Sequence, residues 1–357
     1  MKKSLIALAV LAAAGSAYAQ SSVTLFGVVD ATLAFGRGSL SNKTQLTNSG
    51  YNSSRLGFRG VEDLGGGMSA SFWLEAALAN DDGQGGSTNS NNQASGTGAA
   101  VAGRQGLTFA RRSTVSLSGG WGEMRLGRDY TPQFWNITVF DPFGTNGVGT
   151  TETMITGAGG AGLPITTFVR ASNSIGYFLP PNIGGFYGQF QYYLGENNTG
   201  AVTSSDGKGY GLRLGYAAGP LNVAGAISRT TFATGNAHQN NIGGQYDFGV
   251  AKVMAHISHD KLGVVTGKGW LIGGLFPIGA GEIRASYSRY RTDATVAEPT
   301  GKKLALGYVH NLSKRTALYT TYARVRNSGG LAHTLNGSTG AINASSSGYD
   351  FGIRHAF

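Results

Sequence analysis

The last nine residues of the chain, Tyr349-Asp-Phe-Gly-Ile-Arg-His-Ala-Phe357, alternate between two kinds of side chain. Every second residue is aromatic, aliphatic or histidine, and the residues between them are small or charged. Because successive side chains of a β-strand point to opposite faces, this segment predicts a strand with one apolar and one polar face. The same alternation recurs in 22–36, 184–195 and 206–218.

Period-two alternation bounded by Gly, Pro and Asn predicts sixteen strands. These strands span 22–36, 50–61, 67–79, 105–118, 121–130, 168–179, 184–195, 206–218, 220–232, 237–248, 250–260, 266–278, 281–291, 300–311, 315–326 and 346–357. Short turns and longer polar loops alternate between them. An even number of antiparallel strands with turns at one end and loops at the other is typical of bacterial outer-membrane barrels.

The composition decides which face of the strands is outside. Only 13% of the residues are charged, whereas a soluble surface carries about 25–35%. Placing the apolar faces against lipid and the polar faces around a water-filled interior removes this difficulty. An open sheet edge in hydrocarbon would leave backbone groups unpaired, so the sheet must close. The sequence therefore predicts an all-β fold, a 16-stranded antiparallel transmembrane β-barrel.

Residues 1–20, MKKSLIALAVLAAAGSAYAQ, have two lysines, an apolar run and an Ala-Tyr-Ala site. This pattern predicts a cleaved secretory signal peptide over 1–19 and a barrel over 20–357. Absence of cysteine excludes disulfides, thiolate metal sites and cysteine nucleophiles. Beyond the N-terminus, no apolar run approaches the roughly 18 residues of a membrane-spanning helix.

Two of the long loops stand out. Segment 79–105 is rich in Asn, Gly and Ser and is expected to form a mobile external lobe. Segment 131–167 contains Phe134, Trp135 and Phe143, and a long loop with its own apolar residues is usually functional or folded back. We expect this second loop to fold into the barrel and narrow the lumen.

Strand parity selects the residues that face the interior. In the second strand Leu56 and Phe58 face lipid, which turns Arg55 and Arg59 inward. The same reasoning selects Trp73, Glu75, Arg112 and Arg170, with Arg111 as an alternative to Arg112 if the strand end twists. Further lumen-facing candidates are Arg125, Arg213 and Arg284.

Several motifs together resemble the general porins of beta-proteobacteria. They are Ser22-Val-Thr-Leu-Phe-Gly-Val-Val-Asp30, Ser54-Arg-Leu-Gly-Phe-Arg-Gly60, Glu62-Asp-Leu-Gly65, Arg112-Ser-Thr-Val-Ser-Leu-Ser118, Arg125-Leu-Gly-Arg128, Leu306-Gly-Tyr-Val-His-Asn-Leu-Ser-Lys-Arg-Thr316 and Gly352-Ile-Arg-His-Ala-Phe357. The resemblance covers essentially the whole chain after the signal peptide. It implies a homotrimer in the Gram-negative outer membrane, among its lipids and lipopolysaccharide, with the third external loop forming a constriction.

The resemblance also implies roles for individual residues. Arg55, one of Arg111 and Arg112, and Arg170 match a basic cluster of anion-selective relatives, and Phe357 matches the signal for the barrel-assembly machinery. One charge about 6 Å from an ion contributes roughly 0.7 kcal/mol in bulk-like water, so three arginines give about 2 kcal/mol before screening. A narrow pore with these charges is expected to prefer anions roughly tenfold. Glu75 and Asp141 are expected to oppose the arginines across the constriction.

The leading hypothesis is a general diffusion porin for small hydrophilic solutes, with anions preferred. The alternatives are a substrate-selective channel and a non-conducting barrel acting as an adhesin or scaffold. No metal site is expected, because His256 and His259 are three apart in a strand and point to opposite faces. No enzyme is expected either, because the rim candidate His238 has no evident partner for nucleophilic chemistry, and no cofactor is expected. Nucleic acid is not expected as a partner, since the basic residues are dispersed and form no stripe. Aromatic residues near strand ends, including Tyr130 and Phe178, predict interfacial girdles.

Overall fold

The computed structural model describes residues 22–93, 106–156 and 162–357, so the predicted signal peptide lies outside the described residues. Its strands are β1 (Ser22–Arg37), β2 (Lys43–Asn48), β3 (Arg55–Gly65), β4 (Met68–Ala79), β5 (Gln84–Gly85), β6 (Arg112–Gly119), β7 (Gly122–Tyr130), β8 (Arg170–Phe178), β9 (Phe186–Tyr193), β10 (Gly209–Ala218), β11 (Leu221–Thr230), β12 (Ala237–Asp247), β13 (Lys252–Leu262), β14 (Val265–Ile278), β15 (Gly281–Thr292), β16 (Thr300–Asn311), β17 (Thr316–Ser328) and β18 (Ser346–Ala356). Its named helices are α2 (Pro132–Val139) and α3 (Glu152–Ile155).

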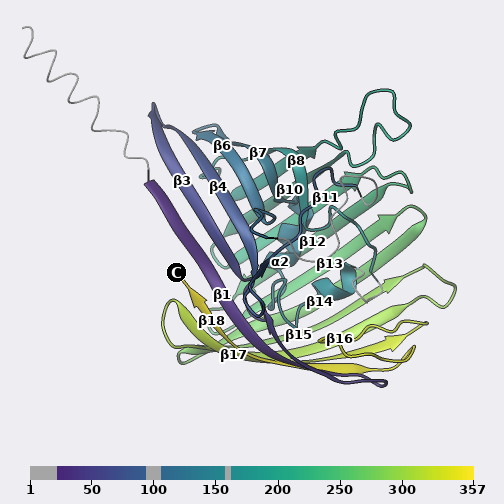
Figure 1. The fold of residues 1–357 in the computed structure, drawn as a ribbon. Helices are drawn as coiled ribbons and strands as arrows, with labels where there is room; N and C mark the ends of the chain where they lie inside the picture. The colour runs from purple at the N-terminus through teal and green to yellow at the C-terminus, as the bar shows by residue number, and fades with distance from the viewer. Residues whose placement is uncertain (1–21, 94–105, 157–161) are drawn as a thin grey trace, which may run out of the picture.

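The strands form one closed antiparallel barrel (Figure 1). Each long strand pairs with its neighbours in sequence, and β1 pairs with β18 from Val28↔Ala356 to Arg37↔Ser347. This pairing of the first and last strands leaves no open edge, as the bilayer interior requires. The predicted sixteen-strand barrel is confirmed.

Two short strands were not predicted. β2 pairs with the loop-side half of β1, and β3 pairs with the other half, so together they fill one position in the barrel wall. Between them, the amides of Tyr51 and Asn52 donate to the Asp30 carboxylate at 2.9 and 2.6 Å. The predicted strand over 50–61 therefore starts five residues too early, because Gly50–Ser54 turns towards Asp30. The other short strand, β5, pairs only with the end of β4.

Strand β16 shows how the two faces differ. Leu304 and Leu306 are 53% and 54% exposed, whereas Lys303 and Ala305 are each 1% exposed. Exposed apolar rows of this kind, which β1, β13 and β14 also carry, form the surface expected to meet lipid. The turn after β3 is tight because Gly65, Gly66 and Gly67 all have positive φ, which residues with a Cβ rarely adopt.

The described residues of the connection between β7 and β8, 131–156 and 162–169, carry both helices and lie inside the barrel; we call them the inner segment. On one side, Asn136 of α2 donates to the Ala224 carbonyl at 3.0 Å and to Asn241 Oδ1 at 2.9 Å. On the other, the amide of Val148 donates to the Asp350 carboxylate at 2.7 Å. A segment that touches β11, β12 and β18 lies across a closed ring. Figure 1 shows α2 among the strands.

An apolar cluster fixes this inner segment against the wall. It joins residues of the segment to β15, β16, β17 and the loop after β17. Its members from the segment are Phe134, Ile137, Phe143, Val148, Met154, Ile155, Leu163, Ile165 and Phe168. The described helices are all too short or too polar to cross a bilayer.

The predicted mobile lobe over 79–105 is partly wrong. Asn92 donates to the Ser172 carbonyl at 2.9 Å and accepts from the Ser172 amide at 2.6 Å. Gln93 donates to Asn197 Oδ1 at 2.8 Å. The composition of this segment suggested only low complexity. In the structure, however, the side chains of Asn92 and Gln93 form hydrogen bonds at the loop ends of β8 and β9. Residues 94–105 lie outside the described part.

Candidate functional site

A cavity of about 660 Å³ lies between the barrel wall and the inner segment. The wall contributes arginines from β3, β6 and β8, and the inner segment contributes Phe134, Trp135, Thr138 and Glu152. The charged lining residues are Arg55, Arg111, Arg112, Arg170, Glu75 and Glu152. Four cations less two carboxylates leave two positive charges when both acids are ionised.

The ion pair between Arg111 and Glu75 organises the cluster. Arg111 Nε lies 2.5 Å from Glu75 Oε1, and Trp73 donates its indole N–H to Glu75 Oε2 at 3.0 Å. Arg55 reaches the same carboxylate only at 3.8 Å, and its side chain keeps 29% of its surface exposed. The Glu75 carboxylate therefore binds Arg111 and Trp73 closely and Arg55 only weakly. Of the two arginines near Glu75, Arg55 has the guanidinium that is more available to a solute.

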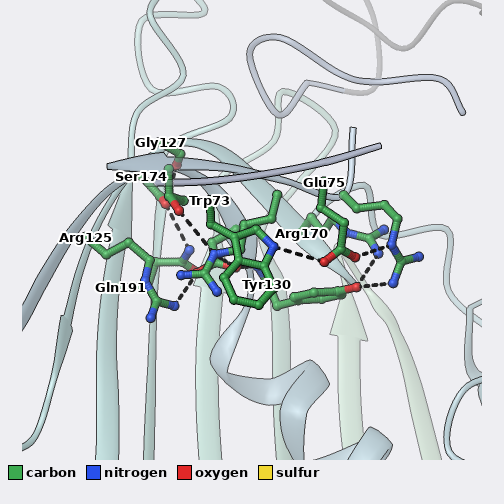
Figure 2. Close-up of polar contacts among 12 residues, drawn as sticks. Trp73, Glu75, Arg125, Gly127, Tyr130, Arg170, Ser174 and Gln191 are labelled. Atoms are coloured by element: carbon green, nitrogen blue, oxygen red, sulfur yellow. Dashed lines mark hydrogen bonds and ion pairs between the residues drawn. The ribbon is translucent and has the colours of Figure 1, made fainter. Parts of the chain in front are cut away.

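Tyr130 joins two of the arginines (Figure 2). Its hydroxyl accepts from Arg111 at 2.5 Å and from Arg170 at 2.8 Å, and its ring lies under the Arg170 guanidinium at 4.4 Å. The prediction of Tyr130 as an interfacial residue is therefore wrong. A register shift between Gly127 and Asp129 breaks the alternation at this strand end, and Tyr130 pairs with Arg170. Parity counting could not detect that irregularity.

Arg111 and Arg112 both line the cavity, although the sequence offered them as alternatives. Arg112 is in register with Glu75, whereas Arg111 precedes the strand and donates its amide to the Glu75 carbonyl. Arg112 stacks on Trp73 at 4.6 Å and lies 3.8 Å from Asp129. Arg111 lies just before β6 begins, outside the regular alternation, and both arginines reach the same cavity although they are successive residues.

A second cavity of about 470 Å³ shares Trp73 and Arg112 with the first. Arg59 and Arg125 line it nearer the short-turn end of the barrel. Arg125 binds the Glu123 carboxylate at 2.9 and 3.0 Å and Asp129 at 2.6 Å, so its charge is largely compensated. The two cavities therefore adjoin each other along the inner faces of β3, β4 and β7.

Arg213 and Arg284 also face the interior, but they bind protein groups. Arg213 donates to Asn136 of α2 at 2.6 Å. Arg284 donates to the Pro142 carbonyl at 3.2 Å and to Glu282 at 2.9 Å. Neither lines the main cavity, and both connect the wall to the inner segment.

Asp141 lies elsewhere than the sequence suggested. It is buried, and its carboxylate accepts from the amides of Phe143 and Thr151 at 2.8 and 2.9 Å. It therefore folds the inner segment and does not line the cavity. Burial raises its pKa to about 6.

Glu152, which the sequence analysis did not select, is the second carboxylate of the cavity. It is the first residue of α3 and lines the cavity. Burial raises its pKa to about 7, and the nearby Arg170 opposes that shift. Its charge therefore changes near neutral pH. No periodicity could have identified it, because it lies on one turn of helix inside a loop.

Phe357 extends the pairing of β18 and also lines the cavity. Its amide donates to the Gly27 carbonyl at 3.1 Å, and its carbonyl accepts from the Gly27 amide at 3.1 Å. Its ring lies over Gly27, where a Cβ would come within 2.4 Å of it. Within the described ranges, His, Asp and Glu form no cluster suited to a metal ion.

Comparisons with known proteins agree with this architecture. The family model for the Gram-negative porin matches residues 5–330. Outer membrane porin protein 32 of Delftia acidovorans is 38% identical over the whole of both chains. An outer membrane porin protein of Bordetella pertussis is 27% identical, again over both whole chains.

The solved anion-selective porin from Comamonas acidovorans superposes with a TM-score of 0.79 at 36% identity. The match covers 95% of this chain and 100% of that one. The family model matches most of the chain, and the relatives and the solved structure match it over nearly its full length. The chain therefore belongs to the Gram-negative porin family.

Proposed function

We propose that the chain is a general diffusion porin of the Gram-negative outer membrane that passes small hydrophilic solutes and prefers anions. The observation that carries the proposal is the cavity with four arginines and two carboxylates between wall and inner segment. A passive pore needs a wetted opening and a field, and charged rings at a constriction supply selectivity. We assign the constriction to Arg55, Arg111, Arg112, Arg170, Glu75 and Glu152.

Aromatic rings hold the arginines in place without neutralising them. Trp73 and Tyr130 stack under Arg112 and Arg170, and a ring face attracts a guanidinium while leaving its charge intact. Fixed cations stabilise a passing anion without reorganising first, whereas mobile lysine side chains would have to move. We therefore attribute the anion preference both to the number of arginines in the cavity and to the fixed positions of their guanidinium groups.

The reversal potential across a planar bilayer tests this proposal. With a tenfold KCl gradient across a neutral lipid membrane, we expect the sign of a chloride-selective pore. The anion-to-cation permeability ratio should be roughly ten when both carboxylates are ionised, because the cavity then has two net positive charges and each contributes roughly 0.7 kcal/mol. A cation-selective sign, or a barrel without conductance, would contradict the proposal, and the latter would favour an adhesin or scaffold.

The partners belong to the same proposal. We infer a homotrimer, outer-membrane lipids and lipopolysaccharide around the barrel, and recognition of Phe357 by the barrel-assembly machinery. Conductance steps in threes would support the trimer. Deletion of Phe357 should lower the amount of folded protein in the membrane, while refolding of purified protein in detergent proceeds.

A substrate-selective channel is the second candidate, favoured by one observation. Trp73, Trp135 and Phe134 line the cavity beside the arginines and could hold an apolar part of an organic anion. A dedicated site should make the current saturate at low solute concentration. Liposome swelling with sugars of graded size should depend on size alone if the pore is general.

The pH dependence of selectivity follows from Glu152. Its pKa of about 7 means that it is mostly ionised at pH 8 and mostly neutral at pH 6. When Glu152 is ionised, its negative charge offsets the charge of one arginine. When it is neutral, the net charge of the cavity is more positive by one. We therefore expect anion preference to rise about threefold as pH falls from 8 to 6, measured by reversal potential.

Glu152→Gln isolates this group. The variant should keep the high anion preference at both pH values, because the glutamine stays neutral. Asp141, whose pKa is about 6, remains in this variant as an internal control. An unchanged pH response in the variant would assign the titration to Asp141 or another group.

A further inference from the structure

A second stretch of chain, besides the inner segment, enters the barrel. Residues 49–54 connect β2 to β3, and we call them the inward turn. Two backbone amides of this turn, those of Tyr51 and Asn52, donate to the carboxylate of Asp30. Asp30 is fully buried on β1, whereas its neighbour Val29 is exposed on the outer face of that strand. The inward turn therefore lies on the inner side of the barrel wall.

Both oxygens of the Asp30 carboxylate are engaged. Oδ2 accepts from the amides of Tyr51 and Asn52 at 2.9 and 2.6 Å, and Oδ1 accepts from the Tyr319 hydroxyl at 2.5 Å. The backbone amide of Asp30 also donates to the Ser54 hydroxyl at 3.0 Å. Hydrogen bonds to an ionised acceptor are stronger than those between neutral groups. One buried residue of β1 therefore binds the middle and the end of the inward turn.

The inward turn touches the inner segment. The Ser53 hydroxyl donates to Asn146 Oδ1 at 2.6 Å, although 93 positions separate these residues in the chain. Gly147 has a φ of 66°, and a Cβ added there would clash with the carbonyl oxygen of Gly50. Glycine permits both this positive φ and the close approach of the two backbones. The turn and the inner segment therefore meet inside the barrel.

The Tyr51 side chain connects the turn to three further strands. Its hydroxyl accepts from Arg284 of β15 at 3.1 Å, and the Arg284 guanidinium lies 4.5 Å from the centroid of its ring. Arg354 of β18 lies 5.3 Å from the same centroid, and the ring of Tyr319 on β17 is 5.7 Å away. A guanidinium over an aromatic face is attracted to it. Contacts with β1, β15, β17 and β18 thus fix the position of the turn.

Asn52 and Ser53 of the inward turn line the main cavity, a few residues before Arg55. From the inner segment, Thr145 and Asn146 line the same cavity. All four side chains are neutral, so they occupy space and offer hydrogen bonds without changing the field of the arginines. Pore diameter and the donors and acceptors that line a pore determine which uncharged solutes pass. The turn is therefore placed to limit solute size independently of solute charge.

We propose that the inward turn is a second element of the constriction, in which Asn52 and Ser53 limit the size of passing solutes and Asp30 is the positioning residue that holds them. This assignment rests on the proposed function, because it takes the main cavity as the path of the solute. The two concern different properties: the arginines determine the sign of charge selectivity, and the turn determines the size limit. Small sugars exchange hydrogen bonds with the Asn52 amide and the Ser53 hydroxyl and pass, whereas oligosaccharides are excluded.

A single cysteine tests whether the turn lines the path, because the wild-type chain contains no cysteine. In Asn52→Cys, a neutral methanethiosulfonate reagent should lower the single-channel current by about half, since the added group narrows the lumen. The matched control Lys314→Cys carries its thiol on an exposed short turn and should keep its current after modification. An unchanged current in Asn52→Cys, with complete modification verified by mass spectrometry, would overturn the proposal.

Asp30→Ala and Asp30→Asn test the positioning role. Alanine removes both acceptor oxygens, so the inward turn should loosen and a trisaccharide should enter liposomes about threefold faster than with the wild type. Asparagine keeps one oxygen for the amides of Tyr51 and Asn52, and its amino group donates to the Tyr319 hydroxyl, so it should retain the wild-type rate. Asp247→Ala makes the same change as Asp30→Ala at an exposed strand end and should also retain it.

Two swelling results would contradict the role of Asp30. One is a wild-type rate in Asp30→Ala, and the other is equal acceleration in Asp30→Ala and Asp30→Asn, which would assign the effect to charge. Reversal potentials of the same samples separate this role from the proposed function, since a cation-selective wild type would contradict only the latter. Should Asp30→Ala fail to fold, modification of Asn52→Cys decides whether the turn belongs to the constriction.

Discussion

Arg55→Gln/Arg170→Gln is expected to lower the anion-to-cation permeability ratio about tenfold, from roughly ten towards unity. Each charge near 6 Å contributes roughly 0.7 kcal/mol, so two contribute about 1.4 kcal/mol, a factor of about ten. Arg112 and Arg111 then face Glu75 and Glu152, and the charges of the cavity balance at pH 8. Reversal potentials in a KCl gradient measure the change.

These two arginines are better targets than Arg111. Arg111 is the close ion partner of Glu75, so removing it would also leave a buried carboxylate without its counter-charge. That variant would combine a folding defect with a selectivity change. Arg55 lies 3.8 Å from Glu75, and Arg170 donates to the uncharged hydroxyl of Tyr130. Their loss therefore changes the field with less damage to the fold.

Lys314→Gln/Arg315→Gln controls for net charge, because both residues are exposed on a short turn away from the cavity. The control should keep the wild-type ratio. Unchanged selectivity in Arg55→Gln/Arg170→Gln, with single-channel conductance showing an open pore, would mean that these arginines only solvate the wall. Selectivity would then have to arise at Arg59 and Arg112 or at the mouths of the barrel.

The barrel could be predicted from the sequence because its signal is repeated and local. Alternation on strands such as β16 and β18 fixes which side chains share a face, and scarcity of charge fixes which face is outside. The predicted strand boundaries were wrong where tertiary contacts override the two-residue alternation of side chains. At Tyr51 and Asn52, two hydrogen bonds to Asp30 turn the chain away from the strand that alternation predicts.

Of the residues that line the candidate site, only those on regular strands of the barrel wall could be predicted from the sequence. Arg55, Trp73 and Glu75 lie on regular strands, so parity identifies their direction. Tyr130 and Glu152 could not be placed in this way, because one follows a register shift and the other lies on a short helix in a loop.

Lys303→Met is expected to loosen the inner segment while the barrel remains folded. Lys303 is buried on the inner face of β16, and its ammonium donates to the Thr150 carbonyl at 2.5 Å and to Thr153 Oγ1 at 3.0 Å. Methionine fills a similar volume but cannot donate, so the buried carbonyl loses a charged donor. An unsatisfied buried acceptor costs about 1–3 kcal/mol, more where the lost donor is charged. Asp141 and Glu152 also lose a neighbouring positive charge.

Hydrogen exchange should therefore accelerate roughly a hundredfold at the amides of Val148, Thr151 and Met154, which corresponds to about 3 kcal/mol of local stability. Exchange in β15–β17 should stay slow, because their backbone pairing is untouched. Single channels should show larger and noisier currents as the segment leaves the lumen. Lys314→Met makes the same chemical change on an exposed turn and should behave as the wild type. If Lys303→Met leaves both exchange and conductance unchanged, the apolar cluster around Phe143 and Met154 holds the segment without the ammonium, and the narrow pore depends on packing alone.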